Sequence, residues 1–529
     1  MTTRLPTALL FLCVTVTAGA QEAARTIPPA PGPHVGLSAA DLAGARSFRG
    51  DEKVVMTYYF YWYDDRTKTH LVNGDGSDAL TDHPASMVDF SYQSVAWHKR
   101  QFSDMMAAGI DIALPVYWGA PSERDPNART HWSFAGLGPM VQAAEELERE
   151  GKRPPKLGLF YDTSTLQHNS WGEHIDLTTD FGRRWFYASV RDFFSMIPPR
   201  HWAMIDGRPI VSLYAASFAK AHDQRCIDYL KEQFRNDFGG RAPYVIREAS
   251  WQVRSDNLYA WGGALGPKLL RVAEIGPGYD HSNVAGRTRL VVDREGGAFY
   301  ERSWQKVLRR QPKIVAIETW NEFHEGTDIA DSRESGRRYI ELTRKYVDLF
   351  KASRGPERPS GPYANAAAVE ITLGEKDVER GLKRVEAADG LTTPAHAGGR
   401  EGRTTRLLTP GLGRYVYFAI DDGFKRPGPM DIVVEVEYFD GVPATFAIDY
   451  DSFDPSATFD GAYKRAPVVV TSTGSRTWKV ARLPLSQARF ANSQNADADF
   501  RIAVETPALI VGRVTVRRAT AGAAATSTP

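Results

Sequence analysis

The sequence is poor in cysteine, in net charge and in long apolar runs. It holds 2 Cys in 529 residues and has a formal net charge of +1. So few cysteines exclude a disulfide framework and a zinc cluster built on thiolates. A charge balance this close to zero gives no reason to expect a nucleic-acid or anionic-membrane partner. Since no later segment has the roughly 20 apolar residues of a membrane span, we expect no membrane insertion and a fold stabilised by core burial.

The N-terminus has the layout of a cleavable signal peptide. Arg4 precedes the mostly apolar run Ala8–Val16, and the small residues Ala18, Gly19 and Ala20 follow it. A membrane anchor is the alternative, but about nine apolar residues are too few to cross ~30 Å of hydrocarbon. We therefore expect residues 1–20 to be removed after Ala20 and the protein to be secreted or periplasmic.

Residues 21–50 are rich in Ala, Pro and Gly and are predicted to be an extended N-terminal segment. From 51 to 352 a unit of a short β-rich run and an amphipathic helix recurs. The predicted strands are Val54–Tyr61, Ile110–Tyr117, Lys156–Tyr161, Pro209–Tyr214, Pro243–Arg247, Leu258–Trp261, Leu269–Ile275 and Ile314–Thr319. The predicted helices are Val95–Ala108, Gly138–Glu150, Asp180–Met196, Asp223–Phe238, Phe299–Arg309 and Ser335–Lys351. This α/β pattern predicts a (β/α)8 TIM barrel, with a doubly wound open sheet as the alternative.

After a Pro-rich linker at 353–368, the hydrophobic period changes from 3.6 to 2, which predicts an all-β sandwich over 369–518. Its predicted strands are Tyr415–Ile420, Asp431–Phe439, Thr445–Tyr450, Val468–Ser472, Thr477–Leu483, Phe500–Glu505 and Leu509–Arg517. The domain is similar to carbohydrate-binding modules in size and position, and Asp449–Asp454 with Tyr463 is a candidate sugar-binding loop. A purely structural module is the alternative. The tail at 519–529 is predicted to be disordered.

Aromatic rings and carboxylates follow nearly every predicted barrel strand, at the barrel face where active sites lie. Flat rings suit sugar binding because the C–H faces of a pyranose pack on them, whereas a core would favour Val, Leu and Ile. The candidate substrate-binding residues are Tyr58, Tyr59, Trp62, Trp118, Tyr161, Asp162, Trp251, Tyr279, Asp280, Trp320, Asn321 and His324. For Asp162 and Asp280 a structural cap is an equally good interpretation.

Glu322 and Glu325 are the candidate catalytic residues. Cleavage of a glycosidic bond needs one group to protonate the leaving oxygen and a second to deliver or assist a nucleophile. Two nearby carboxyls also push their pKa values apart, which keeps one protonated. Stabilisation of a helix N-terminus is the alternative, but the next helix is expected only from about Ser332.

The segment from Trp320 to Thr327 (WNEFHEGT) resembles the signature of the glycoside hydrolase family 99-like proteins, the endo-α-mannosidases and endo-α-mannanases. The resemblance includes Tyr58–Tyr63, Pro277–Asp280 and Glu334–Tyr339, so it brackets the whole expected barrel. It implies a barrel fold and no metal.

For the site, the resemblance implies Glu325 as general acid/base. It also implies that Glu322 assists the sugar 2-hydroxyl as an internal nucleophile, with net retention. Phe323 stands where the family usually has Trp, and residues 328–332 follow the family pattern only in part. The resemblance therefore does not carry a mannose substrate over to this chain.

Together these features predict a secreted, retaining, endo-acting glycoside hydrolase with a carbohydrate substrate, no cofactor and no metal. His70, His83 and His98 have no metal-ligand spacing with nearby carboxylates. One alternative is a glycosyltransferase-like relative in polysaccharide synthesis, although an exported protein lacks nucleotide sugars. Another is a non-catalytic glycan-binding protein, which the retained glutamate pair disfavours. The sugar, the linkage, endo versus exo action and the oligomeric state stay open.

Overall fold

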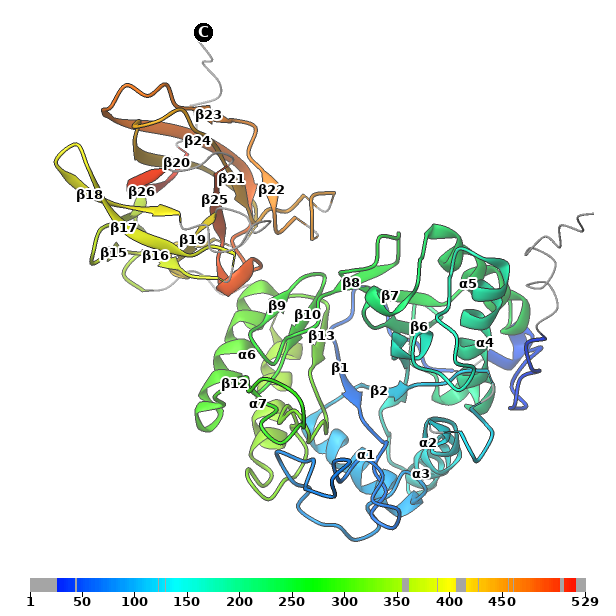
Figure 1. The fold of residues 1–529 in the computed structure, drawn as a ribbon. Coiled ribbons are helices and arrows are strands. Elements are labelled where there is room, and N and C mark those ends of the chain that lie inside the picture. Colours follow the sequence, from blue (N-terminus) through cyan, green and yellow to red (C-terminus); the bar gives the residue numbers. More distant parts are fainter. Residues whose placement is uncertain are drawn as a thin grey trace, which may run out of the picture.

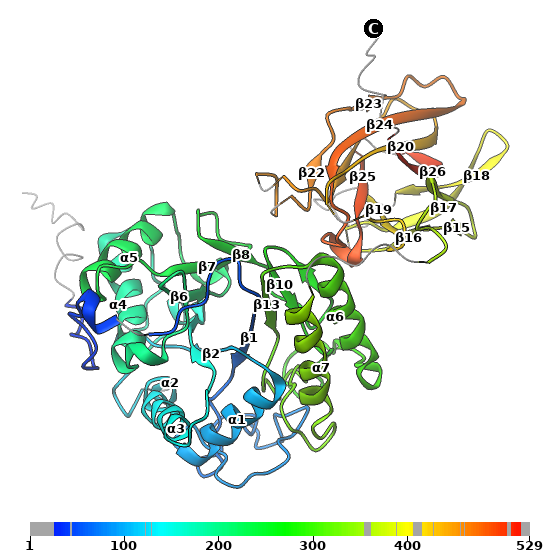
Figure 2. The ribbon, with the colours of Figure 1, turned by 180° about the vertical axis from the view of Figure 1, so that it is seen from behind.

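The computed structural model describes residues 26–519, except 43–44, 122, 129, 354–360, 388, 406–414, 427, 455, 460 and 505–508. The expected signal peptide, most of the expected tail and part of the expected linker lie outside the described residues. The chain forms a barrel-like α/β part and a β-sandwich, which lie side by side in both ribbon views (Figure 1; Figure 2).

Eight parallel strands form a nearly closed barrel sheet. They are β1 (Val54–Tyr59), β2 (Ile112–Tyr117), β4 (Leu159–Tyr161), β6 (Arg208–Leu213), β7 (Tyr244–Glu248), β8 (Asn257–Tyr259), β10 (Val272–Ile275) and β13 (Ile314–Ile317). The hydrogen-bonded order is β8-β7-β6-β4-β2-β1-β13-β10. β8 and β10 lie close together but share no ladder, so a seam separates them. The sheet is extended by β3 (Lys156–Leu157), β5 (Met204–Ile205) and β9 (Lys268–Leu269), and a hairpin is formed by β11 (Tyr279–Asp280) and β12 (Val291–Val292).

Helices surround this sheet (Figure 2). They are α1 (Val95–Ala108), α2 (His131–Ala135), α3 (Leu137–Arg149), α4 (Asp180–Met196), α5 (Gln224–Asp237), α6 (Ala298–Arg310) and α7 (Arg338–Ala352). Short 3-10 helices are η3 (Ala39–Leu42), η4 (Thr163–Leu166), η5 (Pro199–His201), η6 (Ala216–Phe218) and η7 (Glu295–Gly297). Each predicted barrel strand and helix overlaps one of these elements.

The regular eightfold repeat is present only in part. The described connections between β7 and β8 and between β8 and β10 contain no helix. Only residues 249–256 join β7 to β8, which is shorter than a crossover with a helix needs. The seam therefore falls where the helical covering is missing.

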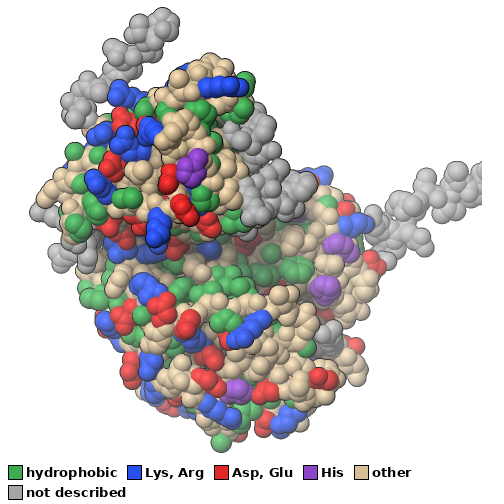
Figure 3. Space-filling model, turned by 60° about the vertical axis from the view of Figure 1, so that its left-hand side comes forward, with side chains coloured by type: hydrophobic (Ala, Val, Ile, Leu, Met, Phe, Trp, Pro, Cys, Tyr) green, Lys and Arg blue, Asp and Glu red, His purple; other side chains and the backbone are tan. Residues whose placement is uncertain are grey.

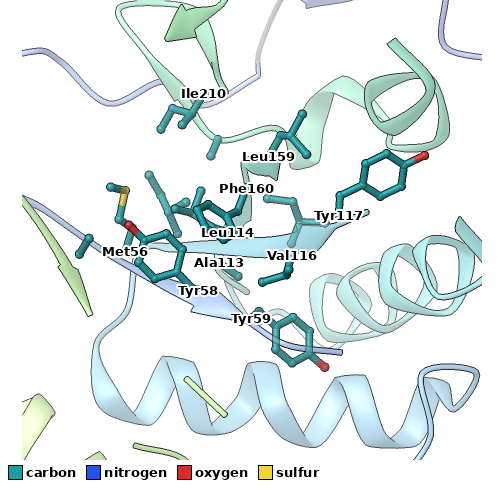
Figure 4. Close-up of a cluster of buried hydrophobic side chains, with 14 of the residues drawn as sticks. Met56, Tyr58, Tyr59, Ala113, Leu114, Val116, Tyr117, Leu159, Phe160 and Ile210 are labelled. Atoms are coloured by element: carbon teal, nitrogen blue, oxygen red, sulfur yellow. The ribbon is translucent and has the colours of Figure 1, made fainter. Parts of the chain in front are cut away.

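Side chains on the barrel strands alternate between the barrel interior and the helices. All six residues of β1 are buried. Tyr58 points inward, where its ring contacts Phe160, and Tyr59 points to α1, where its hydroxyl bonds His98 Nδ1 at 2.8 Å. Figure 4 shows the two rings on opposite sides of β1. Because the strand period is two, only every second aromatic residue can reach a site inside the barrel.

The second part is an antiparallel sandwich of two sheets around its own apolar core. One sheet contains β14 (Ala368–Thr372), β15 (Val378–Arg380), β17 (Thr392–Ala397), β18 (Arg400–Thr405), β20 (Met430–Phe439), β24 (Trp478–Ala488) and β26 (Ile510–Arg518). The other contains β16 (Leu382–Val385), β19 (Tyr415–Ile420), β21 (Thr445–Tyr450), β22 (Lys464–Arg465), β23 (Val470–Thr471) and β25 (Phe500–Val504), and η8 (Asn495–Asp497) precedes β25. Several strands before β19 carry many polar residues, which is why the alternation pattern did not reveal them.

The candidate sugar-binding loop of the sandwich is mostly internal. Asp449 pairs with Arg465 and Arg501, and the buried Asp451 pairs with Arg489. Tyr450 is fully buried. These carboxylates neutralise arginines within the fold, so the prediction of a sugar-binding loop here is not supported.

Helix α6 connects the two parts through charged side chains. Lys306 Nζ lies 2.7 Å from Asp497 Oδ2, and Arg309 lies 2.5 Å from Asp422 Oδ2. The outer surface mixes acidic and basic side chains over both parts in Figure 3, without a broad area of one sign. Among the described residues, no helix combines the length and apolar character of a membrane span.

The seam between β8 and β10 makes a stability prediction. A Cβ on Gly263 would lie 2.7 Å from the backbone of Glu274 and Ile275, and Gly263 does not have a positive φ. We expect Gly263→Ala to lower the free energy of unfolding by about 1–3 kcal/mol, the usual range for overpacking. Urea denaturation followed by tryptophan fluorescence measures it.

The control is Gly138→Ala in α3, because a Cβ on the exposed Gly138 would meet nothing within 4 Å. This variant should unfold at the wild-type urea concentration or slightly above it. Equal behaviour of the two variants would contradict close packing at the seam.

Candidate active-site cleft

A cleft of about 930 Å³ opens at the C-terminal ends of the barrel strands. Its carboxylates are Glu318, Glu322, Glu325 and Asp162. Its aromatic residues are Phe60, Trp62, Trp118, Phe160, Tyr214, Phe218, Trp261 and Tyr279. Carboxylates and rings that are distant in the sequence thus meet in one concave space.

Six candidate substrate-binding residues are buried and do not line the cleft. Tyr58, Tyr59 and Tyr161 are 0% exposed. Tyr58 lies in the barrel interior and donates its hydroxyl proton to Glu274 Oε2 at 3.1 Å, below the cleft. Tyr59 and Tyr161 point outward; the Tyr161 ring packs on Phe186 of α4. For these three residues the prediction of substrate contact does not agree with their placement.

Trp251, Trp320 and Asn321 are also buried, each for a separate reason. Trp251 donates its indole N–H to the carbonyl of Tyr214 at 2.5 Å. Trp320 donates to Gln101 Oε1 of α1 at 2.7 Å, so its ring lies outside the barrel. Asn321 is bonded to backbone, as described below. These residues support the cleft from behind and do not face it.

Trp62, Trp118, Asp162 and Tyr279 do line the cleft. Trp118 donates its indole N–H to Asp162 Oδ2, and Asp162 Oδ1 accepts the N–H of Ser164 at 3.0 Å. Asp162 therefore caps η4 and faces the cleft at once, and burial raises its pKa. Asp280, in contrast, accepts the backbone N–H of Ser282 at 2.8 Å and is a turn residue outside the cleft.

The loop after β13, residues 319–327, is held by its own hydrogen bonds. Asn321 accepts the N–H of Phe60 at 2.8 Å and donates to the Phe60 carbonyl at 2.7 Å. The Thr319 N–H bonds the Thr327 carbonyl at 2.9 Å, and the Thr319 hydroxyl accepts the N–H of Glu322 at 2.8 Å. These contacts attach the loop to the end of β1 and fix where its glutamates lie.

Glu322 is a buried carboxylate paired with a histidine. Its Oε1 contacts His324 Nδ1 at 2.7 Å and accepts the His324 backbone N–H at 2.9 Å. Burial raises the pKa of Glu322, and His324 offsets part of that effect. Burial disfavours the imidazolium of His324, but the Glu322 carboxylate outweighs it and raises the His324 pKa. His324 thus orients Glu322 and does not line the cleft.

Glu325 lies at the more open side of the cleft, with its side chain 22% exposed. Its Oε1 accepts a hydrogen bond from Arg287 on the β11–β12 hairpin. The backbone N–H of Asp280 donates to the Glu325 carbonyl at 2.9 Å. The β11–β12 hairpin and the loop after β13 are therefore linked through both a backbone and a side-chain hydrogen bond.

Glu318 is a third glutamate in the cleft and was not among the candidate residues. Its Oε2 accepts the N–H groups of Gly262 and Gly263 at 2.9 and 2.8 Å. Burial is the main reason that its pKa rises to about 7; the Gly262 amide lowers the pKa and nearby Glu325 raises it. The sequence signal that could have identified Glu318 as a cleft residue is its place at the end of the eighth predicted strand. Trp261, which also lines the cleft, has the same place in the sixth predicted strand.

Among the described residues, no group of three or more His, Cys, Asp and Glu side chains is arranged to hold a metal ion. The single described cysteine, Cys226, is buried in α5, and burial raises its pKa to about 12. The chemistry of the cleft therefore has to be considered from its carboxylates.

Arg294 ties the back of the loop to the barrel. It donates to the Gly326 and Asp328 carbonyls at 2.7 and 2.9 Å and lies 2.6 Å from Asp82 and 2.9 Å from Asp328 carboxylate oxygens. Asp328 is fully buried, and burial raises its pKa whereas Arg294 lowers it. Arg294 is therefore the cation that offsets part of the cost of burying this carboxylate.

The model of one protein family, described as a domain of unknown function (DUF5010), matches residues 39–361. The human glycoprotein endo-alpha-1,2-mannosidase-like protein is 33% identical over 97 residues, which are 16% of this chain and 21% of that protein. The mouse glycoprotein endo-alpha-1,2-mannosidase is 32% identical over 101 residues, 16% of this chain and 22% of that protein. These matches span about a fifth of the relatives' length, and they confirm the resemblance to endo-α-mannosidases.

Among solved structures, the GH99 endo-alpha-mannosidase from Bacteroides thetaiotaomicron in complex with bis-Tris propane is similar with a TM-score of 0.42 and 16% identity. The alignment covers 57% of this chain and 98% of that one.

Loss of Arg294 should disrupt the loop. Arg294→Met leaves the buried Asp328 without its cation, and breaking a buried pair in this way costs about 3–5 kcal/mol. We expect a clear loss of stability in thermal unfolding. The matched control is Arg302→Met, which removes an exposed pair with Glu295 and should change the melting temperature little. Similar effects of the two substitutions would contradict the role of Arg294.

Proposed function

The chain belongs to the DUF5010 family, and we propose that it is a glycoside hydrolase that cleaves a poly- or oligosaccharide with Glu322 and Glu325. The observation that carries the proposal is the cleft, where these carboxylates lie among aromatic rings from several strand ends. The names of the relatives, a glycoprotein endo-alpha-1,2-mannosidase and an endo-alpha-1,2-mannosidase-like protein, support a glycan as the substrate. A glycosidic bond needs no cofactor for hydrolysis when an acid and a nucleophile or base are both present.

In this proposal Glu325 is the general acid/base. It lies at the accessible side of the cleft, where a departing sugar oxygen can approach it. In the structure Arg287 pairs with Glu325, and in this proposal the sugar displaces the Arg287 side chain from that carboxylate. Glu325 then protonates the leaving oxygen and afterwards accepts a proton from the attacking water.

Glu322 assists the attack on the anomeric carbon from the side of the glycosidic bond opposite Glu325. Its raised pKa makes it a stronger base than an exposed carboxylate, and His324 holds its orientation. Glu322 accepts the proton of the sugar 2-hydroxyl while that oxygen attacks the anomeric carbon. Water then opens the resulting three-membered ring at the anomeric carbon while Glu322 returns its proton to the 2-oxygen, which gives net retention.

Endo action fits the size and lining of the cleft. Its volume of about 930 Å³ is near the upper end of the range for small-molecule sites, about 300–1,000 Å³. Trp62, Trp118 and Trp261 come from different strand ends, so rings are available on several sides for neighbouring sugar units.

Hydrolysis of a polysaccharide panel tests the proposal. The panel includes α-1,2-linked manno-oligosaccharides and mannan, because of the relatives' names, and glucans, galactans and xylans. We expect oligosaccharide products from one of them, and Glu325→Gln and Glu322→Gln should each lower turnover at least ~100-fold.

The matched control is Glu379→Gln, an exposed glutamate on β15 of the sandwich, which should keep the wild-type rate. Proton NMR of the first product reports its anomeric configuration and hence retention. Near-wild-type turnover of Glu325→Gln or Glu322→Gln would refute the role assigned to that glutamate. If no polysaccharide of the panel releases oligosaccharides, the assignment as a glycoside hydrolase is refuted.

Export is a separate part of the proposal. It is supported by the apolar run and small residues before Gln21. When the full chain is expressed in a Gram-negative host, mass spectrometry should find the periplasmic protein beginning at Gln21. An uncleaved chain in the cytosol would contradict export.

A further inference from the structure

Glu318 differs from the other cleft glutamates in how its two oxygens are used. Oε2 accepts both Gly262 and Gly263 N–H groups, so that oxygen is bound to backbone. Oε1 has no hydrogen-bond partner among the described residues, although Glu318 lines the cleft. A buried carboxyl with one oxygen anchored and the other directed to the cleft is placed to meet a ligand.

We propose that Glu318 is a substrate-binding residue that, in its protonated form, donates the Oε1 hydrogen to a sugar oxygen while Oε2 stays anchored on the Gly262 and Gly263 amides. This inference rests on the proposed function, because it concerns the sugar bound in the same cleft. It gives the cleft a third glutamate with a task separate from that of Glu322 and Glu325.

The surroundings of Glu318 favour a neutral carboxyl near neutral pH. Burial raises its pKa to about 7. The nearby carboxylate of Glu325 also raises the Glu318 pKa, and Glu274 on β10 interacts electrostatically with Glu318. Lys268 on β9 lowers the Glu318 pKa. The other titratable groups around it are the hydroxyls of Tyr58 on β1, Tyr214 after β6 and Tyr259 on β8.

The expected pH dependence follows from the protonated form being the one that binds. Below pH 7 the hydrogen is present and substrate affinity is constant. As the pH rises through about 7, the carboxylate has no hydrogen to donate and repels sugar lone pairs. Affinity should then weaken about tenfold per pH unit until the ionised form dominates binding.

A purely structural role is the competing explanation. Glu318, on the chain after β13, reaches the segment after β8 and so bridges the unpaired seam of the barrel. Glu318→Gln separates the two roles. The two backbone N–H groups require an acceptor, so the amide oxygen takes the place of Oε2 and the NH2 group faces the cleft as a permanent donor.

The experiment measures KM and kcat from pH 5 to 9 on the panel substrate that the wild type cleaves. For the wild type, KM should rise about tenfold per pH unit above 7, whereas Glu318→Gln should have a flat KM profile. Glu318→Ala should raise KM at every pH, and Glu379→Gln should follow the wild type. Glu322 and Glu325 act on the chemical step, so kcat keeps its own pH dependence in Glu318→Gln.

Identical KM profiles for the wild type and Glu318→Gln, with a lower melting temperature only for Glu318→Ala, would overturn the inference and leave the structural role. That result would leave the proposed function intact, because turnover itself is present.

Infrared difference spectroscopy gives a second measurement without substrate. Between acid and alkaline pH the wild type should lose a protonated-carboxyl C=O band with a midpoint near 7 that Glu318→Gln lacks. The buried Asp192, with a pKa raised to about 7, contributes to both proteins and cancels in the comparison. If no such band distinguishes the two proteins, the inference fails even if no substrate is cleaved.

Discussion

The cleft depends on the pair of hydrogen bonds between the Asn321 side chain and the backbone of Phe60. An amide side chain that meets both the N–H and the C=O of one residue holds the loop after β13 in a single position relative to β1. Phe60 itself faces the cleft, and Glu322 follows Asn321 directly. The first and last strands of the barrel are thereby joined where the carboxylates lie.

The amino-acid sequence predicts much of this arrangement. Apolar runs and amphipathic helices predict the barrel elements well, because most residues of the barrel strands are buried and each long helix buries one face. The seam is harder to predict, because the short polar connection after β7 resembles an ordinary loop. In the sandwich, strands such as Thr392–Ala397 and Arg400–Thr405 carry few apolar residues and are held mainly by their ladders.

The candidate site was predicted in its position but only partly in its residues. Tyr58 and Tyr59 are equivalent in sequence terms, yet the strand pleat sends one into the barrel and the other to α1. Trp320 and Asn321 are the two residues before Glu322, and both are buried and do not line the cleft. Proximity in the motif therefore does not imply contact with the substrate, whereas Glu318, four residues before Glu322, lines the cleft.

Three glutamates from one strand end have three different environments. Glu322 is buried against His324, Glu318 is anchored on two amides, and Glu325 is exposed enough to meet Arg287. Different environments allow carboxyls of the same type to take different protonation states, which acid/base chemistry at one pH requires.

The sandwich contacts the barrel through α6, and its acidic candidate loop neutralises internal arginines.

The proposed mechanism requires a glycosidic bond to lie between Glu322 and Glu325 in the cleft. A crystal structure of Glu325→Gln with an oligosaccharide from the cleaved polysaccharide tests this most directly. We expect sugar units stacked on Trp62, Trp118 or Trp261, with one glycosidic oxygen about 2.6–3.2 Å from the side chain at position 325. An oligosaccharide bound only to the sandwich, or in the cleft with no glycosidic oxygen near position 325, would contradict it.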